Sequence, residues 1–303
     1  MKFFLNEFFN CLKLELASLA CKMKQYLDAL RHVLENGADR QSRTGIKTRA
    51  VFGMQLRFNM EDGFPAVTTK KLPWKSVASE LLWFIEGSND ERRLAEILHG
   101  TRDESKKTIW TANAEADYWK QKSKFQGDLG RIYGVQWRKW KAPDGREIDQ
   151  LAEAISLIKE KPTSRRMIVT AWNPGELNEM ALPPCHAFFQ FFVADNKLSL
   201  MMYQRSCDMF LGVPFNIASY SLLLHMAAQV TNLKPAEFIH ILADAHVYHN
   251  HFEQVKEQLK RKPFELPTLK LNPSIKNIDD FRMEDIQLEN YNFHPAIKAE
   301  MAV

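Results

Sequence analysis

Apolar side chains take up the spacing of one helix face from Met23 onward, and this pattern ends at an Asn-Gly pair at residues 36–37. Between Thr48 and Asn59 the period changes to two, because apolar residues alternate there with polar ones. The sequence therefore predicts a helix that opens the domain, followed by a half-buried strand.

A second helix is predicted from Trp74 to Ile85, where the sequence WKSVASELLWFI is mostly apolar. Glu80 stands inside this apolar segment. A carboxylate is costly to bury unless it has polar partners. Glu80 is therefore the first candidate for a functional role.

The rest of the chain mixes strand and helix patterns. Apolar runs predict buried strands at Arg166 to Trp172, Ala187 to Ala194 and Lys197 to Arg205, the last two joined as a hairpin. Helices are predicted from Glu147 to Lys159 and, buried at the centre, from Asn216 to Val230. No repeat or low-complexity linker divides the chain. We expect one α+β domain over residues 23–303, with a peripheral helical insertion at about residues 87–126.

Composition narrows the classes of function. At 303 residues and 35.2 kDa, with 45% hydrophobic residues, the chain can bury a core without disulfides. Its 41 Lys and Arg against 37 Asp and Glu give a net charge of +4, too small an excess for a dedicated nucleic-acid-binding protein. The four cysteines are widely spaced, and no apolar run reaches the roughly 18 residues of a membrane span. We expect a cytoplasmic protein with reduced thiols and no membrane association.

Residues 1–22 are rich in Phe and Leu and contain Lys2, so a secretory signal is one interpretation. Glu7, Lys13 and Glu15 divide the apolar stretch into pieces shorter than the roughly 7 to 15 residues of a signal core. We favour an N-terminal extension that lies outside the main domain.

A candidate nucleophile stands in Pro183-Pro184-Cys185-His186, where two prolines fix an extended approach to a strand. A thiol placed there can attack an electrophilic carbon if neighbouring cations lower its pKa. Side chains alternate across a strand, so His186 is expected to face away from Cys185 and is not the obvious base. An inert buried cysteine is the alternative interpretation.

Candidate phosphate ligands follow the hairpin in the segment Gln204 to Asp208. Arg205 and Ser206 have the chemistry to hold a phosphate, and Asp208 can accept from an N–H of a heterocycle. Arg43, Arg165 and Arg166 are further candidates. Guanidinium groups gathered at one site would also activate a thiol. A surface ion pair is the alternative for this segment.

The histidine-rich stretch from His246 to His251 fits no familiar zinc spacing, and no metal site is expected. On a strand, His246 and Tyr248 share one face and can hydrogen-bond a sugar hydroxyl, the alternative being an aromatic strand end. The chain also lacks the P-loop, the dinucleotide-binding glycine motif and HExxH.

Several motifs together resemble the thymidylate synthase family from Met23 to Val303, namely SELLWF, SRRMIVTAWNP, LPPCHAFFQF, YQRSCD, GVPFNIASY and the ending HPAIKAEMAV. Because these motifs are several and occur in the order typical of the family, the probability of a chance match is very small. The resemblance implies a three-layer α+β fold, with a large mixed sheet packed against helices.

The resemblance implies reductive methylation of dUMP to dTMP for de novo dTMP biosynthesis, with methylenetetrahydrofolate giving both the carbon and the hydride and leaving as dihydrofolate. Cys185 corresponds to the nucleophile that attacks C6 of the uracil. Glu80 corresponds to a carboxylate that handles protons through water, and Tyr133 to a tyrosine implicated in removing the C5 proton. Arg205, Asp208 and Asn216 complete the implied catalytic set.

The resemblance also implies an obligate homodimer with shared sites. The implied phosphate ligands are Arg43, Arg205 and Ser206, together with Arg165 and Arg166 from the other subunit. Asn216 corresponds to the amide that reads the uracil edge, because it can donate to O4 and accept from N3–H. His246 and Tyr248 correspond to the ligands of the 3′-hydroxyl, and Cys207 and Val247 belong to the same nucleotide-binding segments.

For the folate, the resemblance implies that Asp208 binds the pterin and Lys70 meets the glutamate tail. The residues implied to line the folate site are Ile109, Trp110, Leu182, Gly212 and Phe215. Ala302 and Val303 correspond to a C-terminal tail that closes over the site and excludes water. The chain departs from the family at Thr111, where an Asp usually follows the TIW tripeptide.

Other functions remain as alternatives. The closest is a pyrimidine nucleotide hydroxymethylase on the same scaffold, in which water instead of hydride captures the exocyclic carbon. An RNA-binding scaffold without activity is a second, although a net charge of +4 supports it little. A cysteine hydrolase would explain neither the arginines nor Asn216, and a zinc deaminase would need a second cysteine after PCHAF.

Overall fold

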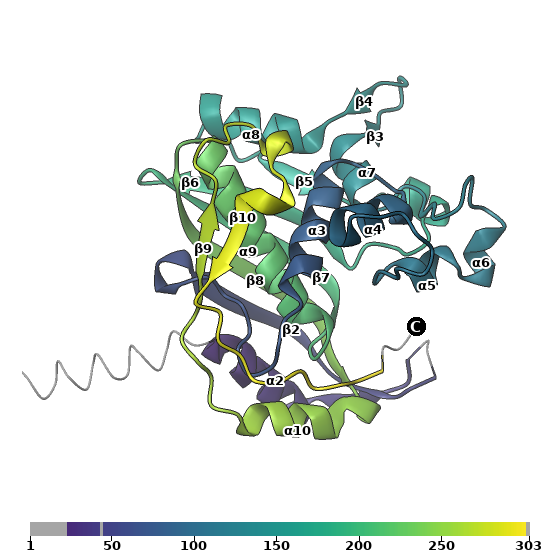
Figure 1. The fold of residues 1–303 in the computed structure, drawn as a ribbon, viewed down its shortest axis with the longest axis vertical. Helices are drawn as coiled ribbons and strands as arrows, with labels where there is room; N and C mark the ends of the chain where they lie inside the picture. The colour runs from purple at the N-terminus through teal and green to yellow at the C-terminus, as the bar shows by residue number, and fades with distance from the viewer. Residues whose placement is uncertain (1–22, 43–44, 301–303) are drawn as a thin grey trace, which may run out of the picture.

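A computed structural model describes residues 23–42 and 45–300 of the chain (Figure 1). The α+β class expected from the sequence is confirmed, since a six-stranded mixed sheet is packed against helices. The predictions for residues 1–22, for Arg43 and for the closing tail Ala302-Val303 lie outside the described residues.

The central sheet has the order β1-β2-β8-β7-β6-β5. Its strands are β1 (Ala38–Arg40), β2 (Thr48–Asn59), β5 (Ile168–Thr170), β6 (His186–Ala194), β7 (Lys197–Asp208) and β8 (Lys234–Tyr248). Neighbours are antiparallel except β7 and β8, which run parallel. Because β7 and β8 are parallel neighbours, their C-terminal ends lie at the same edge of the sheet.

Helices cover this sheet and extend beyond it, with α3 lying against α9 (Figure 1). They are α2 (Lys24–Asn36), α3 (Trp74–Ile85), α4 (Glu91–His99), α5 (Thr111–Ala114), α6 (Asp117–Lys120), α7 (Tyr133–Arg138), α8 (Gln150–Glu160), α9 (Gly212–Val230) and α10 (Phe252–Lys260). Two small sheets pair β3 (Trp140–Lys141) with β4 (Glu147–Ile148) and β9 (Thr268–Leu271) with β10 (Ile286–Glu289). None of the helices in the described part of the chain is long and apolar enough to cross a membrane.

Most predicted elements are confirmed, although several boundaries differ: β5 is shorter than the predicted 166–172, β7 runs on to Asp208, and the starts of two helices shift. Residues 147–148 form β4 instead of helix, because the Asp149 side chain accepts a hydrogen bond from the Ala152 N–H at 2.9 Å and starts α8 after it. The central helix α9 begins at Gly212 and not at Asn216, since Pro214 falls in its first turn, where the missing N–H costs nothing.

The two faces of the central sheet differ. On one face Val169 and Phe189 are fully buried, and the Phe189 ring lies 5.5 Å from that of Tyr220 on α9. On the other face of the same strands, Ile168 is 43% exposed and Phe192 is 64% exposed. Helices therefore cover one face of β5 and β6, while apolar side chains remain open on the other.

Candidate active site

Three motifs that are far apart in the sequence meet at one edge of the sheet. The Arg205 N–H at the end of β7 donates to the Cys185 carbonyl at 2.8 Å. The Met209 N–H, just after β7, donates to the His246 carbonyl of β8 at 2.8 Å. These backbone hydrogen bonds hold the PPCH, QRSCD and HVYHN motifs together as one site.

The thiol of Cys185 lies between a tyrosine and an arginine. The Cys185 N–H donates to the Tyr133 hydroxyl oxygen at 2.7 Å. Burial raises the pKa of the Cys185 thiol, while the Arg205 charge and hydrogen bonds with Tyr133 and Ser206 act to lower it. Within the described chain, Arg205 is the cation that favours the thiolate.

Arg205 is fixed by its own neighbours. Its Nε donates to the Pro184 carbonyl at 2.8 Å and its Nη2 to the Pro183 carbonyl at 2.9 Å. The guanidinium carbon also lies 5.2 Å from the centre of the Trp172 ring, within cation-π range. The two prolines before Cys185 thus offer the carbonyls that orient the cation beside the thiol.

Glu80 is 8% exposed on α3, and its carboxylate Oε1 accepts from the Trp110 indole Nε1 at 2.7 Å. Burial raises the pKa of Glu80 to about 7, and the Trp110 hydrogen bond partly opposes that rise. A group with this pKa changes protonation near neutral pH, which suits a general acid or base.

Buried aromatic side chains, among them Tyr133 and Tyr220, lie between Glu80 and the Cys185 segment. The Glu80 charge acts on Tyr133 of α7 and Tyr220 of α9, and burial holds the pKa of both phenols well above the ordinary value. The His186 ring lies against that of Tyr133, with ring centres 4.1 Å apart and a tilt of 32°, and its Nδ1 lies 2.7 Å from the Tyr220 hydroxyl oxygen. Burial lowers the pKa of His186 to about 3, so its imidazole is neutral. The sequence analysis assigned no role to His186, although its position next to Cys185 could have indicated one.

Asp208 and Asn216 lie at the start of α9. The Asp208 Oδ1 accepts from the N–H groups of Phe210 and Leu211 at 3.0 and 3.1 Å. A Cβ at Gly212 would lie 3.7 Å from the Asp208 Cβ and 3.8 Å from the Asn216 Oδ1, so Gly212 stands between them. Among the described residues the Asn216 amide has no hydrogen-bond partner, which leaves it able to read a ligand.

Lys70 is buried near the same turn. Its ammonium donates to the Phe210 carbonyl and lies 3.7 Å from the centre of the Phe210 ring. Burial lowers the pKa of Lys70 to about 8, with Asp208 acting in the opposite direction. Lys70 is therefore held by the protein in this arrangement and is not open to solvent.

His246 has a carboxylate partner that sequence reasoning missed. Its Nδ1 lies 3.2 Å from the Asp244 Oδ1, and the Arg40 Nη1 donates to the Asp244 Oδ2 at 2.8 Å. Although burial acts against the charged form, Asp244 raises the pKa of His246. Asp244 lies two residues before His246, the spacing of one strand face, and this was the available signal.

The structure does not bring every predicted residue to this site. Arg165 and Arg166 are exposed just before β5 and precede Met167, whose carbonyl accepts from the N–H of Phe191, six residues along β6 from Cys185. Ile109 lies beside Trp110 and is 48% exposed. The Cys207 and Val247 side chains are fully buried, so contact with a ligand falls to their main-chain atoms. Leu182 and Phe215 are half-buried.

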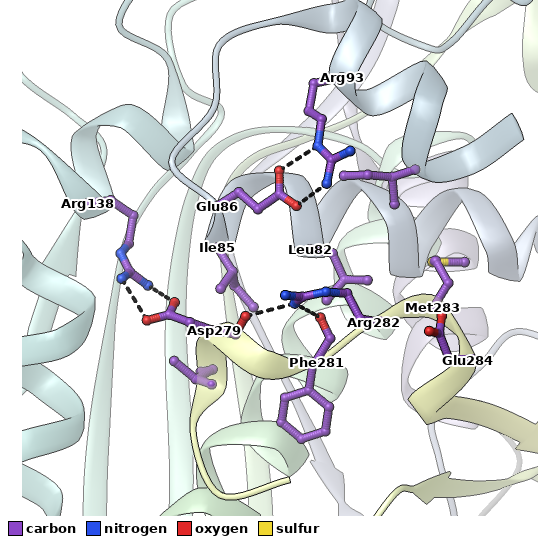
Figure 2. A pocket seen from close by; sticks show the side chains of 12 residues that line it. Leu82, Ile85, Glu86, Arg93, Arg138, Asp279, Phe281, Arg282, Met283 and Glu284 are labelled. Carbon is purple, nitrogen blue, oxygen red and sulfur yellow. Dashed lines mark hydrogen bonds and ion pairs between the residues drawn. The ribbon is translucent and has the colours of Figure 1, made fainter. Parts of the chain in front are cut away.

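A cavity of about 610 Å³ lies beside α3 (Figure 2), and helix geometry puts it on the opposite side of α3 from Glu80. Leu82 and Ile85 line it, and both lie more than a third of a helical turn away from Glu80 around α3. Ion pairs cross its walls, joining Arg93 to Glu86 and joining Arg138 to Asp279 in the η4 turn (Ile278–Asp280) (Figure 2). This cavity is separate from the site around Cys185.

Within residues 23–42 and 45–300, no group of three or more His, Cys, Asp or Glu side chains is arranged to hold a metal ion.

The family model described as thymidylate synthase matches residues 24–303, which is nearly the whole chain.

Proposed function

The chain belongs to the thymidylate synthase family, and from this premise we propose that it catalyses the reductive methylation of dUMP to dTMP with methylenetetrahydrofolate, releasing dihydrofolate. The observation that carries the proposal is the Cys185 thiol beside Arg205 and Tyr133, with the neutral-range carboxylate Glu80 on the adjacent helix. A thiol that a neighbouring cation helps to ionise and a carboxylate of pKa near 7 are what nucleophilic addition and proton transfer require.

The first step uses Cys185 as the nucleophile. After the thiol has lost its proton, Sγ forms a bond to C6 of the uracil, and the C5–C6 π electrons move toward O4 to make an enolate. Burial alone disfavours the thiolate, so cations must favour it. Arg205 supplies one in the described chain, and the nucleotide-binding arginines Arg43, Arg165 and Arg166 would add to it.

Glu80 handles protons at the pyrimidine. A pKa of about 7 lets the carboxyl group deliver a proton to O4 and recover one later without a large free-energy penalty in either direction. Tyr133 accepts from the Cys185 N–H and so lies beside the nucleophile, where it is placed to help remove the C5 proton.

Nucleotide recognition falls to groups at the same edge of the sheet. Asn216, whose amide has no partner within the described chain, can donate to O4 and accept from N3–H of uracil. An aspartate there would favour cytosine. His246, oriented by Asp244, and Tyr248 would hydrogen-bond the 3′-hydroxyl, and Arg205 with Ser206 would hold the phosphate.

The described residues fit a folate. The Asp208 carboxylate can accept from pterin N–H groups, Phe215 lies in the first turn of α9, and the Trp110 indole is held against Glu80 of α3. Leu182 would add a further apolar side chain. When bound, methylenetetrahydrofolate supplies the one-carbon unit and the hydride. Trp110 would then contact the folate while its indole donates to Glu80.

We further propose a homodimer. Arg165 and Arg166 are exposed and distant from Cys185 in their own chain, and the neighbouring sheet face exposes Ile168 and Phe192. An open apolar face of this kind is typical of a protein-protein interface. Pairing two such faces would allow each chain to lend Arg165 and Arg166 to the other site.

The test is the rise in absorbance from dihydrofolate when the purified protein is mixed with dUMP and methylenetetrahydrofolate. We expect a rise with the native chain and none with Cys185→Ala. Cys207→Ala is the matched control, because the Cys207 thiol is fully buried and donates to the Gln204 carbonyl at 3.3 Å, and it should be dispensable for the chemistry. Equal rates in the native chain and Cys185→Ala would contradict the proposal.

A further inference from the structure

Thr111, where the chain departs from the family pattern, is hydrogen-bonded to a carboxylate on a different helix, α4. The Thr111 hydroxyl donates to the Glu91 carboxylate Oε1 at 2.6 Å. Thr108 donates to the same oxygen, also at 2.6 Å. Position 111 thus has no carboxylate of its own, but its side chain is hydrogen-bonded to one that comes from the first turn of α4.

Glu91 is among the most buried charged groups of the described chain, at 2% exposure. The Arg92 guanidinium neutralises it through two bonds, from Nε to Oε2 and from Nη2 to Oε1, both at 2.6 Å. Arg92 also donates to the carbonyls of Asp103 and Lys106, at 2.8 and 3.1 Å. The Glu91–Arg92 pair therefore holds the loop between α4 and Trp110 in place through these hydrogen bonds.

This cluster leads directly to Glu80. The Trp110 N–H donates to the Thr108 hydroxyl oxygen at 3.2 Å, and the Thr108 N–H donates to the Thr111 hydroxyl oxygen at 2.8 Å. The backbone N–H groups of Thr108 and Trp110 are thus held by hydroxyl groups that both donate to Glu91. The Trp110 indole in turn donates to Glu80 at 2.7 Å.

We propose that Glu91 is a positioning residue that holds the Thr108 and Thr111 hydroxyls from α4 and thereby holds the Trp110 indole on Glu80. Glu91 acts only through Thr108 and Thr111 and touches no substrate. Its consequence for catalysis rests on the function proposed above, whereas its effect on Trp110 and Glu80 does not.

An exchange of carboxylates tests this directly. Glu91→Gln removes the charge that the two hydroxyls and Arg92 share, and Thr111→Asp places a second carboxylate against Glu91, where like charges repel. In the double variant Glu91→Gln/Thr111→Asp a single carboxylate remains, now at position 111, where it can accept the Thr108 N–H and face Arg92. Glu96→Gln on the exposed side of α4 is the matched control.

The readout independent of activity is the Trp110 indole resonance in protein labelled with ¹⁵N-tryptophan, assigned through Trp110→Phe and followed against pH. The titratable groups that act on Glu80 from neighbouring helices, Tyr133 and Tyr220, stay neutral in this range, so the midpoint near 7 reports Glu80. We expect both single variants to move the midpoint upward, because the indole hydrogen bond favours the carboxylate. The double variant should return most of the way, and Glu96→Gln should not move it.

The sign separates positioning from charge alone, since an unpaired Arg92 left by Glu91→Gln would move the midpoint downward. A midpoint that falls or stays constant in Glu91→Gln, or a double variant no better than either single one, would overturn the proposal. In the dihydrofolate assay kcat should fall about 10- to 100-fold in each single variant while KM for dUMP changes little. If the native chain forms no dihydrofolate but the resonance behaves as expected, the proposed function fails and the positioning role stands.

Discussion

Two buried carboxylates on successive helices have opposite surroundings. Glu91 on α4 is 2% exposed and is held by the Arg92 guanidinium and two threonine hydroxyls. Glu80 on α3 is 8% exposed, and its side-chain hydrogen-bond partner in the described chain is the neutral Trp110 indole. Two similarly buried carboxylates therefore differ in their partners: Glu91 has a guanidinium and two hydroxyls, while Glu80 has one neutral indole and a pKa raised to about 7.

The difference shows how a buried carboxylate can serve either structure or chemistry. A cation and several donors compensate for the burial of the Glu91 carboxylate, and these hydrogen bonds hold the neighbouring loop. Without a cation, desolvation of Glu80 destabilises its charged form until the two protonation states are nearly equal in free energy. Such a group can exchange a proton with a bound substrate at neutral pH.

Removing Glu80 should have the largest effect on activity. We expect Glu80→Gln to reduce kcat for dihydrofolate formation by about 10²- to 10⁴-fold, since the amide cannot transfer a proton. Binding of dUMP, measured by calorimetry, should be retained. A variant that keeps more than half of the native kcat would show that Glu80 is not the proton-transfer group.

The same variant should gain stability in a defined pH window. The pKa of Glu80 is raised from 4.5 when unfolded to about 7 when folded, so ionisation favours the unfolded chain as the pH rises between these values. The stability of Glu80→Gln relative to the native chain, from denaturant unfolding, should therefore increase from pH 4.5 to 7 and then level off. A constant difference across this range would contradict the raised pKa.

Breaking the Glu91 pair should have the largest effect on stability. We expect Glu91→Leu to lower the free energy of unfolding by about 3 to 5 kcal/mol, because Arg92 is then left buried without a counter-charge. The double variant Glu91→Leu/Arg92→Met should recover most of this loss in denaturant unfolding. If the double variant is as unstable as the single one, an unpaired charge is not the cause.

A smaller and more specific change follows from the indole. Trp110→Phe removes the donor that favours ionised Glu80. The pH-rate limb that reports Glu80 should move upward by about one to two pH units, the equivalent of one hydrogen bond to a charged group. An unchanged limb in kcat/KM against pH would mean that another group determines the profile.

The smallest effect is expected on the other side of α3. Glu86 pairs with Arg93 at 2.7 Å on the wall of the cavity in Figure 2, and both side chains are about one-third exposed. Glu86→Gln should change the free energy of unfolding by no more than about 1 kcal/mol and leave dihydrofolate formation unchanged. A loss of activity there would mean that the two faces of α3 are coupled.

The chain's local patterns predicted much of the fold. Periodicity located α2, β2 and α3, and the apolar run around Tyr220 predicted the central helix α9. The order of strands in the sheet could not be predicted in this way, because the pairing of β2 with β8 joins residues nearly 200 positions apart. Such pairings depend on tertiary packing and not on local periodicity.

The site was predicted unevenly. Glu80 could be identified because a carboxylate in an apolar helix needs an explanation, and Cys185 because two prolines precede it. Glu91 could not, since the sequence ERRLAEIL has the composition of an ordinary exposed helix and its burial follows from the loop packed over it. His186 was also missed, because its burial and its contact with Tyr133 depend on the fold.

The most direct test of the proposed chemistry is the identity of the nucleotide product. The native chain and Cys185→Ala would each be incubated with dUMP and methylenetetrahydrofolate. The nucleotides would then be separated and identified by mass spectrometry. We expect dTMP and dihydrofolate in equal amounts from the native chain and neither from Cys185→Ala. A hydroxymethylated nucleotide together with tetrahydrofolate, or unchanged dUMP from the native chain, would contradict reductive methylation.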